Sequence, residues 1–464
     1  MSKFFDFLKR TENIFLIIAL TFGLIFCFIN LPFAASDESS HFIKIYNFTE
    51  GSINFQKYTV NNKTYTAAVM PKNLYDIIAY YESVRYDKLK IKSSDITKNL
   101  VVKIDKKNLL PVVYIPTSYT ICSYLPEFLI FTFFKIFNLP ILVIFYALRL
   151  ISLLFYILLT YFAIKIIPVK KWLLMMCATL PTIIYLAASV SSDGILAGFC
   201  FLFTAYVLNL AFNKNIKKIE LKHILIFTFL ILYITICKYP YSFLVFLFFS
   251  IPKEKFENFR LYLKNFILIL LLLFVYILAN VLYFLFISKG LSHINENIEP
   301  FQNMLNILIN NPINFFNAVI FDLQHVVPYI MQSVATFGWQ EVYLLPRISF
   351  IYMVFLAMSA FQNEKDGPYY LDISVKNKLI YLSVFCGFIF ITLLTCYLLF
   401  SYKGEIGIRN MQGRYLIPVL PLIFLCFSSK NYFKTKIFKY VSIIYILFVY
   451  FVSSIVILNN YYII

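Results

Sequence analysis

The chain alternates between long apolar runs and short clusters of lysine and arginine, and this pattern limits what it can fold into. The first run, residues 13–33, has about the 20 residues that an α-helix needs to cross the hydrocarbon core of a bilayer. Hydrophobic residues make up 61% of the 464 residues and charged residues 14%. No soluble fold of this size hides so much apolar surface from water. The sequence therefore predicts an all-α integral membrane protein.

The formal net charge of +18 arises mainly from the basic clusters between apolar runs. Such a charge in a soluble chain would suggest nucleic acid, but short basic loops are typical of the cytoplasmic side of a membrane protein. We therefore expect a lipid bilayer, and no nucleic acid, as partner. The eight cysteines show no CxxC or Cys/His spacing, so they imply no disulfide framework and no metal site. The first run exceeds the core of a secretory signal, which favours a retained helix.

Placing the basic clusters in the cytoplasm predicts eleven spans and one re-entrant or interfacial element at residues 118–137. Two of the spans are short and flank Lys238-Tyr239-Pro240; short helices are tolerated where they line a polar cavity. The alternative, one long helix kinked at Pro240, would put the later basic clusters outside. The predicted spans are residues 13–33, 140–164, 172–190, 195–212, 223–237, 241–251, 266–287, 348–361, 379–400, 415–427 and 441–458.

These spans divide the chain into five parts. Residues 1–34 hold an N-terminal tail and the first helix, and residues 35–120 form an extracytoplasmic loop with a small α/β or helical piece. Within that loop, residues 75–86 have the pattern of an amphipathic helix and residues 59–67 that of a hairpin. The remaining parts are membrane helices at 121–288, a second extracytoplasmic segment with amphipathic helices around 304–309 and 315–330, and membrane helices at 347–464.

An acidic segment follows the first span directly. Asp37, Glu38 and His41 lie within about one helical turn, a costly cluster to hold beside lipid. The topology places further polar residues at the same outer face, and charges of both signs converging there predict a site. These residues are Ser191, Ser192, Asp193, Lys238 with Tyr239 and Pro240, Trp339, Gln340, Glu341, Arg409, Gln412 and Arg414.

Six motifs in order carry a resemblance to a known family. They are DESSHF after Pro32, VVYIPTSYTICSYLP, LPTIIYLAASVSSDG, CKYPYSFLVFLFFSIP, FGWQEVYLLP and MQGRYLIPVLP. Together they resemble the bacterial polytopic membrane proteins of domain of unknown function 2142, which is similar to the class C (GT-C) glycosyltransferases. The resemblance implies a GT-C-like transferase in the bacterial cytoplasmic membrane that uses a polyprenyl-phosphate sugar. It also implies a catalytic carboxylate in the first outer loop, with the active site facing outward.

The sequence departs from the family pattern at two places. Ala35-Ser36 stands where the family tends to place proline before the acidic pair. Gln340-Glu341 stands where an acid is expected one position earlier.

The chemistry of sugar transfer assigns roles to these residues. A base must take the proton of the acceptor hydroxyl on the glycan, and Asp37 or Glu38 can supply it. The departing phosphate needs cationic stabilisation, for which Arg414 is the first choice, followed by Lys238, Arg409 and His41. A divalent cation, Mg or Mn, held by Asp37 or Glu38 with His41, could share this role. Residues expected to line the substrate site are Gln412, Tyr415, Trp339, Glu341, Tyr239, Asp193 and Arg149.

Each assignment has a structural alternative. Asp37 and Glu38 can simply mark a helix end, with Ser36 and Ser39 as caps. Asp193 can cap the next helix, and Arg149 can pair with Asp193. At the level of function, the alternatives are a non-catalytic transporter or assembly subunit for lipid-linked glycans, and a glycan ligase or polymerase.

Overall fold

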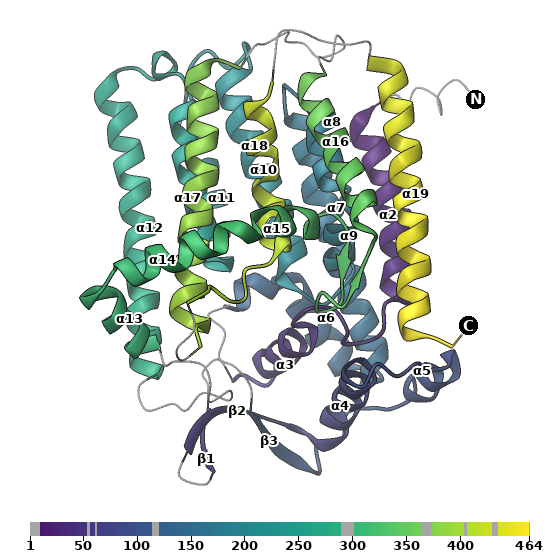
Figure 1. Cartoon of the computed structure of the whole chain (residues 1–464). Coiled ribbons are helices and arrows are strands. Elements are labelled where there is room, and N and C mark those ends of the chain that lie inside the picture. The colour runs from purple at the N-terminus through teal and green to yellow at the C-terminus, as the bar shows by residue number, and fades with distance from the viewer. Residues whose placement is uncertain are drawn as a thin grey trace.

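In the computed structural model, the protein is a helical bundle with a small α/β lobe at one end (Figure 1). The structure describes residues 10–52, 56–60, 63–113, 120–288, 301–362, 373–402, 406–428 and 435–463. Nearly all of the elements are helices, as the apolar runs predict.

Within the described residues, six helices are long and apolar enough to cross a membrane. They are α2 (Thr11–Ile29), α7 (Ile141–Ile166), α10 (Ser192–Phe212), α12 (Phe259–Ser288), α17 (Val375–Phe400) and α19 (Thr435–Tyr461). A seventh candidate is a pair of segments bent by 105°, which consists of α13 (Phe301–Asn310) and the run of α14 (Ile313–Asp322), η4 (Leu323–His325) and α15 (Val326–Gln332). α7 packs against both α2 and α10.

The other five predicted spans are shorter or broken helices, so the described residues contain six or seven clear spans rather than eleven. Proline explains several of the breaks, because it lacks the N–H that continues a helix and clashes with the preceding turn. Pro181 opens α9, Pro240 opens η2 and Pro418 lies inside η5. These shorter elements are α8 (Lys171–Ala178), α9 (Pro181–Ala187), α11 (Leu221–Cys237), η2 (Tyr239–Ser250), α16 (Pro346–Phe361), η5 (Gly413–Val419) and α18 (Leu420–Cys426).

The predicted re-entrant run forms η1 (Ile121–Tyr124) and α6 (Leu125–Ile136), and its residues 118–119 lie outside the described residues. α6 packs along α7 and against α3 (Glu38–Thr49), at the lobe end of the bundle. A short η3 (Lys253–Lys255) precedes α12 at the opposite end.

The lobe contains the hairpin and the amphipathic helix that the sequence predicts. β1 (Gln56–Val60) pairs antiparallel with β2 (Lys63–Pro71), Thr59 facing Thr64, and β2 pairs antiparallel with β3 (Leu109–Val113). Residues 61–62 of the predicted hairpin lie outside the described residues. α4 (Lys72–Tyr86) covers the sheet, and α5 (Ser93–Asn99) follows it. A second hairpin, β4 (Thr336–Phe337) with β5 (Val342–Tyr343), belongs to the bundle.

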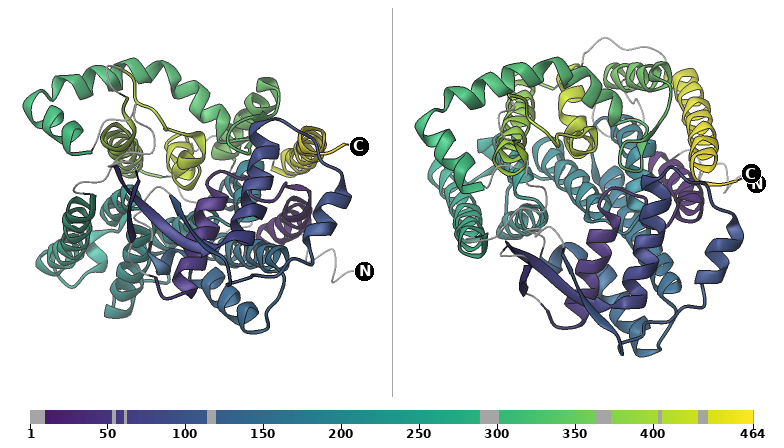
Figure 2. Two further views of the ribbon diagram at one scale, coloured as in Figure 1. Left: turned by 90° about the horizontal axis from the view of Figure 1, so that it is seen from below. Right: turned by 60° about the horizontal axis from the view of Figure 1, so that its bottom comes forward.

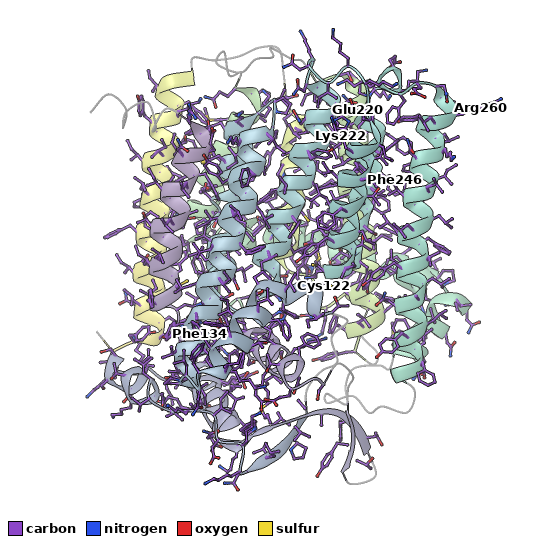
Figure 3. The ribbon with its side chains drawn as sticks, turned by 180° about the vertical axis from the view of Figure 1, so that it is seen from behind. Cys122, Phe134, Glu220, Lys222, Phe246 and Arg260 are labelled. Carbon is purple, nitrogen blue, oxygen red and sulfur yellow. The ribbon has the colours of Figure 1, made fainter. Side chains whose placement is uncertain are left out.

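Labelled residues and the chain termini identify the two ends of the bundle. Glu220, Lys222 and Arg260 all lie at the end away from the lobe, whereas Phe134 lies beside the lobe (Figure 3). α2 starts at the first end and α19 finishes at the lobe end (Figure 1). Seen from the lobe end, α13 to α15 form an arc along one edge of the bundle (Figure 2).

Candidate functional site

The loop after α2 has an unusual backbone. Phe33 and Asp37 both adopt left-handed conformations, with φ of 60° and 61°. Such conformations are uncommon outside glycine and persist where the surroundings enforce them, often at functional sites. Asp37 is the N-cap residue of α3, but its carboxylate makes no capping hydrogen bond. The carboxylate is therefore available for a partner from elsewhere in the chain.

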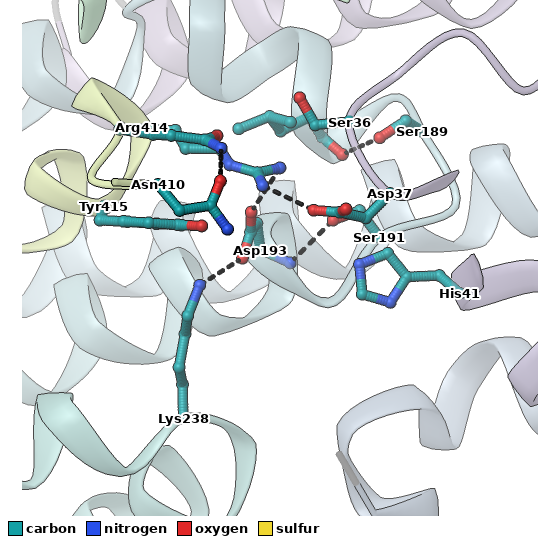
Figure 4. Close-up of polar contacts among 12 residues, drawn as sticks. Ser36, Asp37, His41, Ser189, Ser191, Asp193, Lys238, Asn410, Arg414 and Tyr415 are labelled. Carbon is teal, nitrogen blue, oxygen red and sulfur yellow. Dashed lines mark hydrogen bonds and ion pairs between the residues drawn. The ribbon is translucent and has the colours of Figure 1, made fainter. Parts of the chain in front are cut away.

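That partner is Arg414, at the start of η5. Arg414 Nη2 donates to Asp37 Oδ2 at 2.6 Å, and Nη1 lies 3.3 Å from Asp193 Oδ2. The other oxygen of Asp193 lies 3.4 Å from Lys238 Nζ (Figure 4). The Lys238 ammonium also lies over the ring of Tyr415, 4.0 Å from its centroid. We call Asp37, Asp193, Lys238 and Arg414 the charged network.

The charged network joins four segments at breaks between helices. Asp37 precedes α3, and Asp193 lies in the first turn of α10. Lys238 sits at the junction of α11 and η2, and Arg414 sits in η5. Helix ends and short 3₁₀ segments expose backbone polar groups, which are tolerated at membrane depth only where they line a polar space or are buried in protein.

Arg414 has unused hydrogen-bonding capacity. The residue is only 8% exposed, yet Nε and Nη1 make no hydrogen bond within the described part of the chain. The contact of Nη1 with Asp193 is close enough for an ion pair but lacks hydrogen-bond geometry. Buried donors normally find partners, so two nitrogens without a hydrogen bond on one buried cation indicate a place for a ligand.

A small cavity of about 20 Å³, open to solvent, lies beside Arg414. Besides Arg414, its polar lining consists of hydroxyl and amide side chains: Ser36, Thr182, Tyr185, Gln332, Thr336, Gln340 and Gln412. Gly413 forms part of the wall, where a Cβ would meet the carbonyl oxygen of Tyr329 and the Cβ of Gln332. The pocket therefore joins the cationic end of the network to uncharged hydrogen-bonding groups.

Glu38, although adjacent to Asp37, has an entirely different environment. Its carboxylate accepts two hydrogen bonds of 2.8 Å from Nε and Nη2 of Arg149, and a third of 2.8 Å from Val190 N–H. The remaining Arg149 donors bind the carbonyl oxygens of Cys27, Asn30 and Leu31 at the end of α2. Glu38 and Arg149 are both 0% exposed. We call this pair the buried clamp.

The structure corrects the capping and pairing alternatives. Ser191 caps α10 by accepting the Asp193 N–H, so the Asp193 carboxylate is not the cap. Ser36 donates to the carbonyl of Gly338, so neither it nor Asp37 caps α3. Ser39, the other predicted cap, donates to Glu82. Arg149 pairs with Glu38 rather than with Asp193, because the αL turn at Asp37 sends the two adjacent carboxylates to different partners.

His41 lies in the second turn of α3, with Nδ1 2.5 Å from the hydroxyl of Tyr124. Burial lowers the pKa of His41 to about 4, although Asp37 and Asp193 act in the opposite direction. A neutral imidazole is a poor phosphate ligand, which weakens the predicted role of His41.

The possible metal set, Asp37, Glu38 and His41, is not assembled. Asp37 faces Arg414, Glu38 faces Arg149 and His41 faces Tyr124. Within the described ranges, no three His, Cys, Asp or Glu side chains are grouped to hold a metal ion. The arrangement therefore does not fit a Mg or Mn ion held by these three residues.

Several predicted site residues lie around the network rather than in it. Arg409 is exposed, with its guanidinium 4.1 Å from the centroid of the Tyr402 ring. Trp339 is 43% exposed and stacks with Arg85 of the lobe. Glu341 is exposed and accepts a hydrogen bond from Tyr461. Tyr239 follows Lys238 and is half-buried; Gln412 lines the pocket, and Tyr415 lies under Lys238.

Four polar pocket residues were not singled out from the sequence: Thr182, Tyr185, Gln332 and Thr336. Tyr185 donates to Asn30 Oδ1 at 2.8 Å and accepts from Gly338 N–H at 3.0 Å, so it connects α2 to the β4–β5 hairpin. Thr182 and Tyr185 lie in the motif LPTIIYLAASVSSDG, where they are the only polar side chains before Ser189. Two isolated polar side chains within an apolar run are the sequence feature that could have indicated a place in the site.

Comparison with known proteins identifies one family. The family described as "Predicted membrane protein (DUF2142)" matches residues 20–423, a range that includes the charged network, the buried clamp and the pocket. No curated protein and no solved structure matches the chain.

Proposed function

This chain belongs to the DUF2142 family of predicted membrane proteins, and from that premise we propose that it is a GT-C-like membrane glycosyltransferase. It would move a sugar from a polyprenyl-phosphate donor to a cell-envelope glycan or lipid-linked acceptor at the outer face of the bacterial cytoplasmic membrane. The observation that carries the proposal is Arg414: a buried guanidinium that lies between a carboxylate and a polar pocket, with two nitrogens that make no hydrogen bond to the described residues.

The phosphate of the donor binds at Arg414. The planar guanidinium of Arg414 matches the geometry of phosphate oxygens, and its Nε and Nη1 atoms make no hydrogen bond to the described residues. Lys238 supplies a second cation, positioned by the same Asp193 that faces Arg414. Because the site is largely shielded from water, both cations stabilise the departing phosphate more strongly than they would in bulk solvent.

Asp37 acts as the general base. Its side chain is 38% exposed, so an acceptor hydroxyl can reach it, whereas Glu38 is sealed by the buried clamp. The acceptor oxygen forms a bond to the anomeric carbon as the bond from that carbon to the phosphate oxygen breaks. The proton of the hydroxyl passes to Asp37, and the electron pair leaves with polyprenyl phosphate, which Arg414 and Lys238 hold.

The test is transfer of sugar from a polyprenyl-phosphate donor in membranes that contain matched amounts of each variant. Asp37→Asn should lower the rate by about 10² to 10⁴, as loss of a general base does. Asp76→Asn, which removes an exposed carboxylate paired with Lys72 in the lobe, is the matched control and should keep the rate. Full activity in Asp37→Asn would remove the base and favour the transporter or assembly-subunit alternative.

We also propose that the five shorter or broken apolar segments complete eleven passes and place the lobe outside the cell. Single cysteines in a Cys-free background test this topology. A cysteine at Lys217 should resist an impermeant thiol reagent in intact cells, and one at Lys98 in α5 should react; both side chains are exposed. The opposite labelling pattern would put the charged network on the cytoplasmic side.

A further inference from the structure

We propose that the acceptor is an anionic glycan, and that it binds at the junction of the lobe and the bundle, around Arg85. The inference rests on the proposed function and adds the class of acceptor to it. Like Arg414, Arg85 is a buried arginine with a nitrogen, Nη1, that makes no hydrogen bond to the described residues. We call the residues proposed to bind the glycan the acceptor surface. They are Arg85, Tyr86, Lys88, Lys90, Lys92 and Trp339.

Two aromatic rings hold Arg85, which lies in the last turn of α4. Its guanidinium carbon is 4.3 Å from the centroid of the Tyr86 ring and 4.8 Å from that of Trp339. Arg85 is 7% exposed, whereas Tyr86 is 70% and Trp339 43% exposed. Exposed side chains change rotamer within nanoseconds, so the Tyr86 ring can move aside for a ligand. A carboxylate or phosphate oxygen is the group that best completes a guanidinium with an unused nitrogen.

The turn that carries Trp339 connects the acceptor surface to the proposed base. Trp339 lies between Gly338 and Gln340, which both line the small cavity of the candidate site. Ser36, the residue before Asp37, donates to the carbonyl oxygen of Gly338 at 2.6 Å. Gly338 and Gln340 have φ of 62° and 77°, left-handed conformations of the kind that cluster at functional sites. A glycan that lies over Trp339 would therefore have its end close to Asp37.

Three lysines extend the acceptor surface along the lobe. Residues 88–92 read Lys-Leu-Lys-Ile-Lys, and Ile91 makes two backbone hydrogen bonds of 3.0 Å with the end of α19. Side chains alternate along an extended segment, so Lys90 and Lys92 share the face opposite the buried Ile91. All three lysines are exposed and make no salt bridge with the described residues. Even with the neighbouring Asp87, this segment has a net positive charge, which favours an acidic partner.

The combination of rings and cations favours a glycan over a lipid surface. An aromatic belt at the membrane boundary accounts for exposed Trp and Tyr side chains, but not for a buried arginine between them with an unused nitrogen. A lipid headgroup supplies a negative charge but no ring to pack on Trp339. The electron-rich face of an aromatic ring packs well against the C–H groups of a sugar. An acidic sugar chain therefore uses both features of the acceptor surface.

Binding to the purified full-length protein in nanodiscs of phosphatidylcholine tests the inference. The probes are an oligogalacturonate and its methyl ester, which has the same sugar rings without the charges. We expect the acid to bind at least about tenfold more tightly than the ester at low salt, and the difference to shrink at high salt. Arg85→Gln should weaken binding of the acid about tenfold and leave that of the ester unchanged, since only the charge-assisted contact is lost. An equal loss for both probes would overturn the role of Arg85 in binding the acidic group.

Two triple variants test the lysines. In the first, glutamine replaces Lys88, Lys90 and Lys92, and binding of the acid should weaken about tenfold or more. The matched control replaces three exposed lysines without salt bridges to described residues, from the segments that hold Glu220 and Arg260 at the opposite end of the bundle (Figure 3): Lys217, Lys253 and Lys264. The control should keep the affinity of the wild type. An equal loss in both variants would show that any basic surface attracts the acid, and would overturn the inference.

The remaining outcomes separate the partners and the two proposals. Equal or tighter binding of the ester to the wild type would overturn the anionic class, whether or not the variants fold. If neither probe bound, and the wild type but not the Lys88 triple variant enriched phosphatidylglycerol from mixed nanodiscs, the surface would bind lipid instead. Sugar transfer to uncharged acceptors alone would overturn the anionic class and leave the proposed function. Binding of the acid without transfer to any acceptor would overturn the proposed function and leave the anion-binding surface.

Discussion

Asp37 and Glu38 are neighbours in the sequence, yet they belong to two differently built ion-pair sites. In the buried clamp, all five N–H groups of Arg149 donate to Glu38 or to the end of α2, and nothing is exposed. In the charged network, Arg414 is also buried, but two of its nitrogens, Nε and Nη1, make no hydrogen bond to described residues, and its partner Asp37 reaches solvent.

The difference separates structure from function. A saturated buried pair has nothing left to offer a ligand, and its value lies in fixing the geometry of its surroundings. An unsaturated one stays costly until a ligand completes it. The clamp ties α2, α3 and the loop before α10 together, and so holds the turn from which Asp37 points toward Arg414.

The largest expected effect comes from breaking the clamp. Arg149→Met leaves Glu38 buried without its cation, which should cost about 3–5 kcal/mol of stability. The measurement is thermal or denaturant unfolding of the purified protein in detergent. The double variant with Glu38→Met should recover part of the loss, since both charges are gone, but not all, because the α2 carbonyls remain unpaired. A single variant as stable as the wild type would show that the clamp is not structural.

A smaller effect on stability, but a clear one on binding, is expected in the network. Arg414→Lys keeps the positive charge but loses the planar guanidinium that can bind two phosphate oxygens at once. The affinity for a polyprenyl-phosphate donor should therefore fall about tenfold or more. Stability should change by about 1 kcal/mol, the contribution of one hydrogen bond. Direct binding and unfolding of the same sample measure both. Unchanged donor affinity would remove Arg414 from the phosphate site and erase the contrast with Arg149.

The smallest effect concerns His41 of α3, which the charges of the network act on. Its pKa is lowered by burial to about 4 from an ordinary value of 6.5, so the folded protein holds it neutral. The contribution of His41 to the free energy of unfolding is constant above about pH 6.5. The free energy of unfolding should fall as the pH drops from 6.5 towards 4, because in that range the histidine is protonated in the unfolded chain but still neutral in the folded protein. At pH 5.5 the loss is about 1 kcal/mol.

Unfolding curves of the wild type and of His41→Gln at pH 7.5 and 5.5 measure this difference. The variant should show a smaller decrease between the two pH values than the wild type. An equal decrease in both proteins would assign the pH dependence to other groups.

Much of the architecture could be predicted from the chain alone. Apolar run length located the six long helices, and alternation and helical periodicity found the hairpin near residue 59 and α4. The topology also brought Asp37, Asp193, Lys238 and Arg414 to one place, as the structure does. A charged side chain is costly in lipid, so charged residues within apolar runs face the interior of the bundle and pair with one another.

The sequence did not predict which side chains pair with each other where the pairing depends on a single backbone turn. Whether Asp37 or Glu38 meets Arg149 depends on the left-handed conformation at Asp37, which no sequence period reveals. Thr182 and Tyr185 enter the site because Pro181 breaks the helix above them, and in the sequence they look like lipid-facing residues. Sequence shows which groups must be paired; the tertiary fold chooses the partner.

The sequence separation of the two pairs also sets an order in time. Glu38 and Arg149 lie 111 residues apart, and Asp37 and Arg414 lie 377 apart. At a synthesis rate of about 5–20 residues per second, the clamp can close about 6–20 s after Glu38 is made, whereas Arg414 follows Asp37 by about 20–75 s. The ribosome thus delivers the partner of Glu38 first, and the turn bearing Asp37 is already fixed when the cation that completes the site is translated.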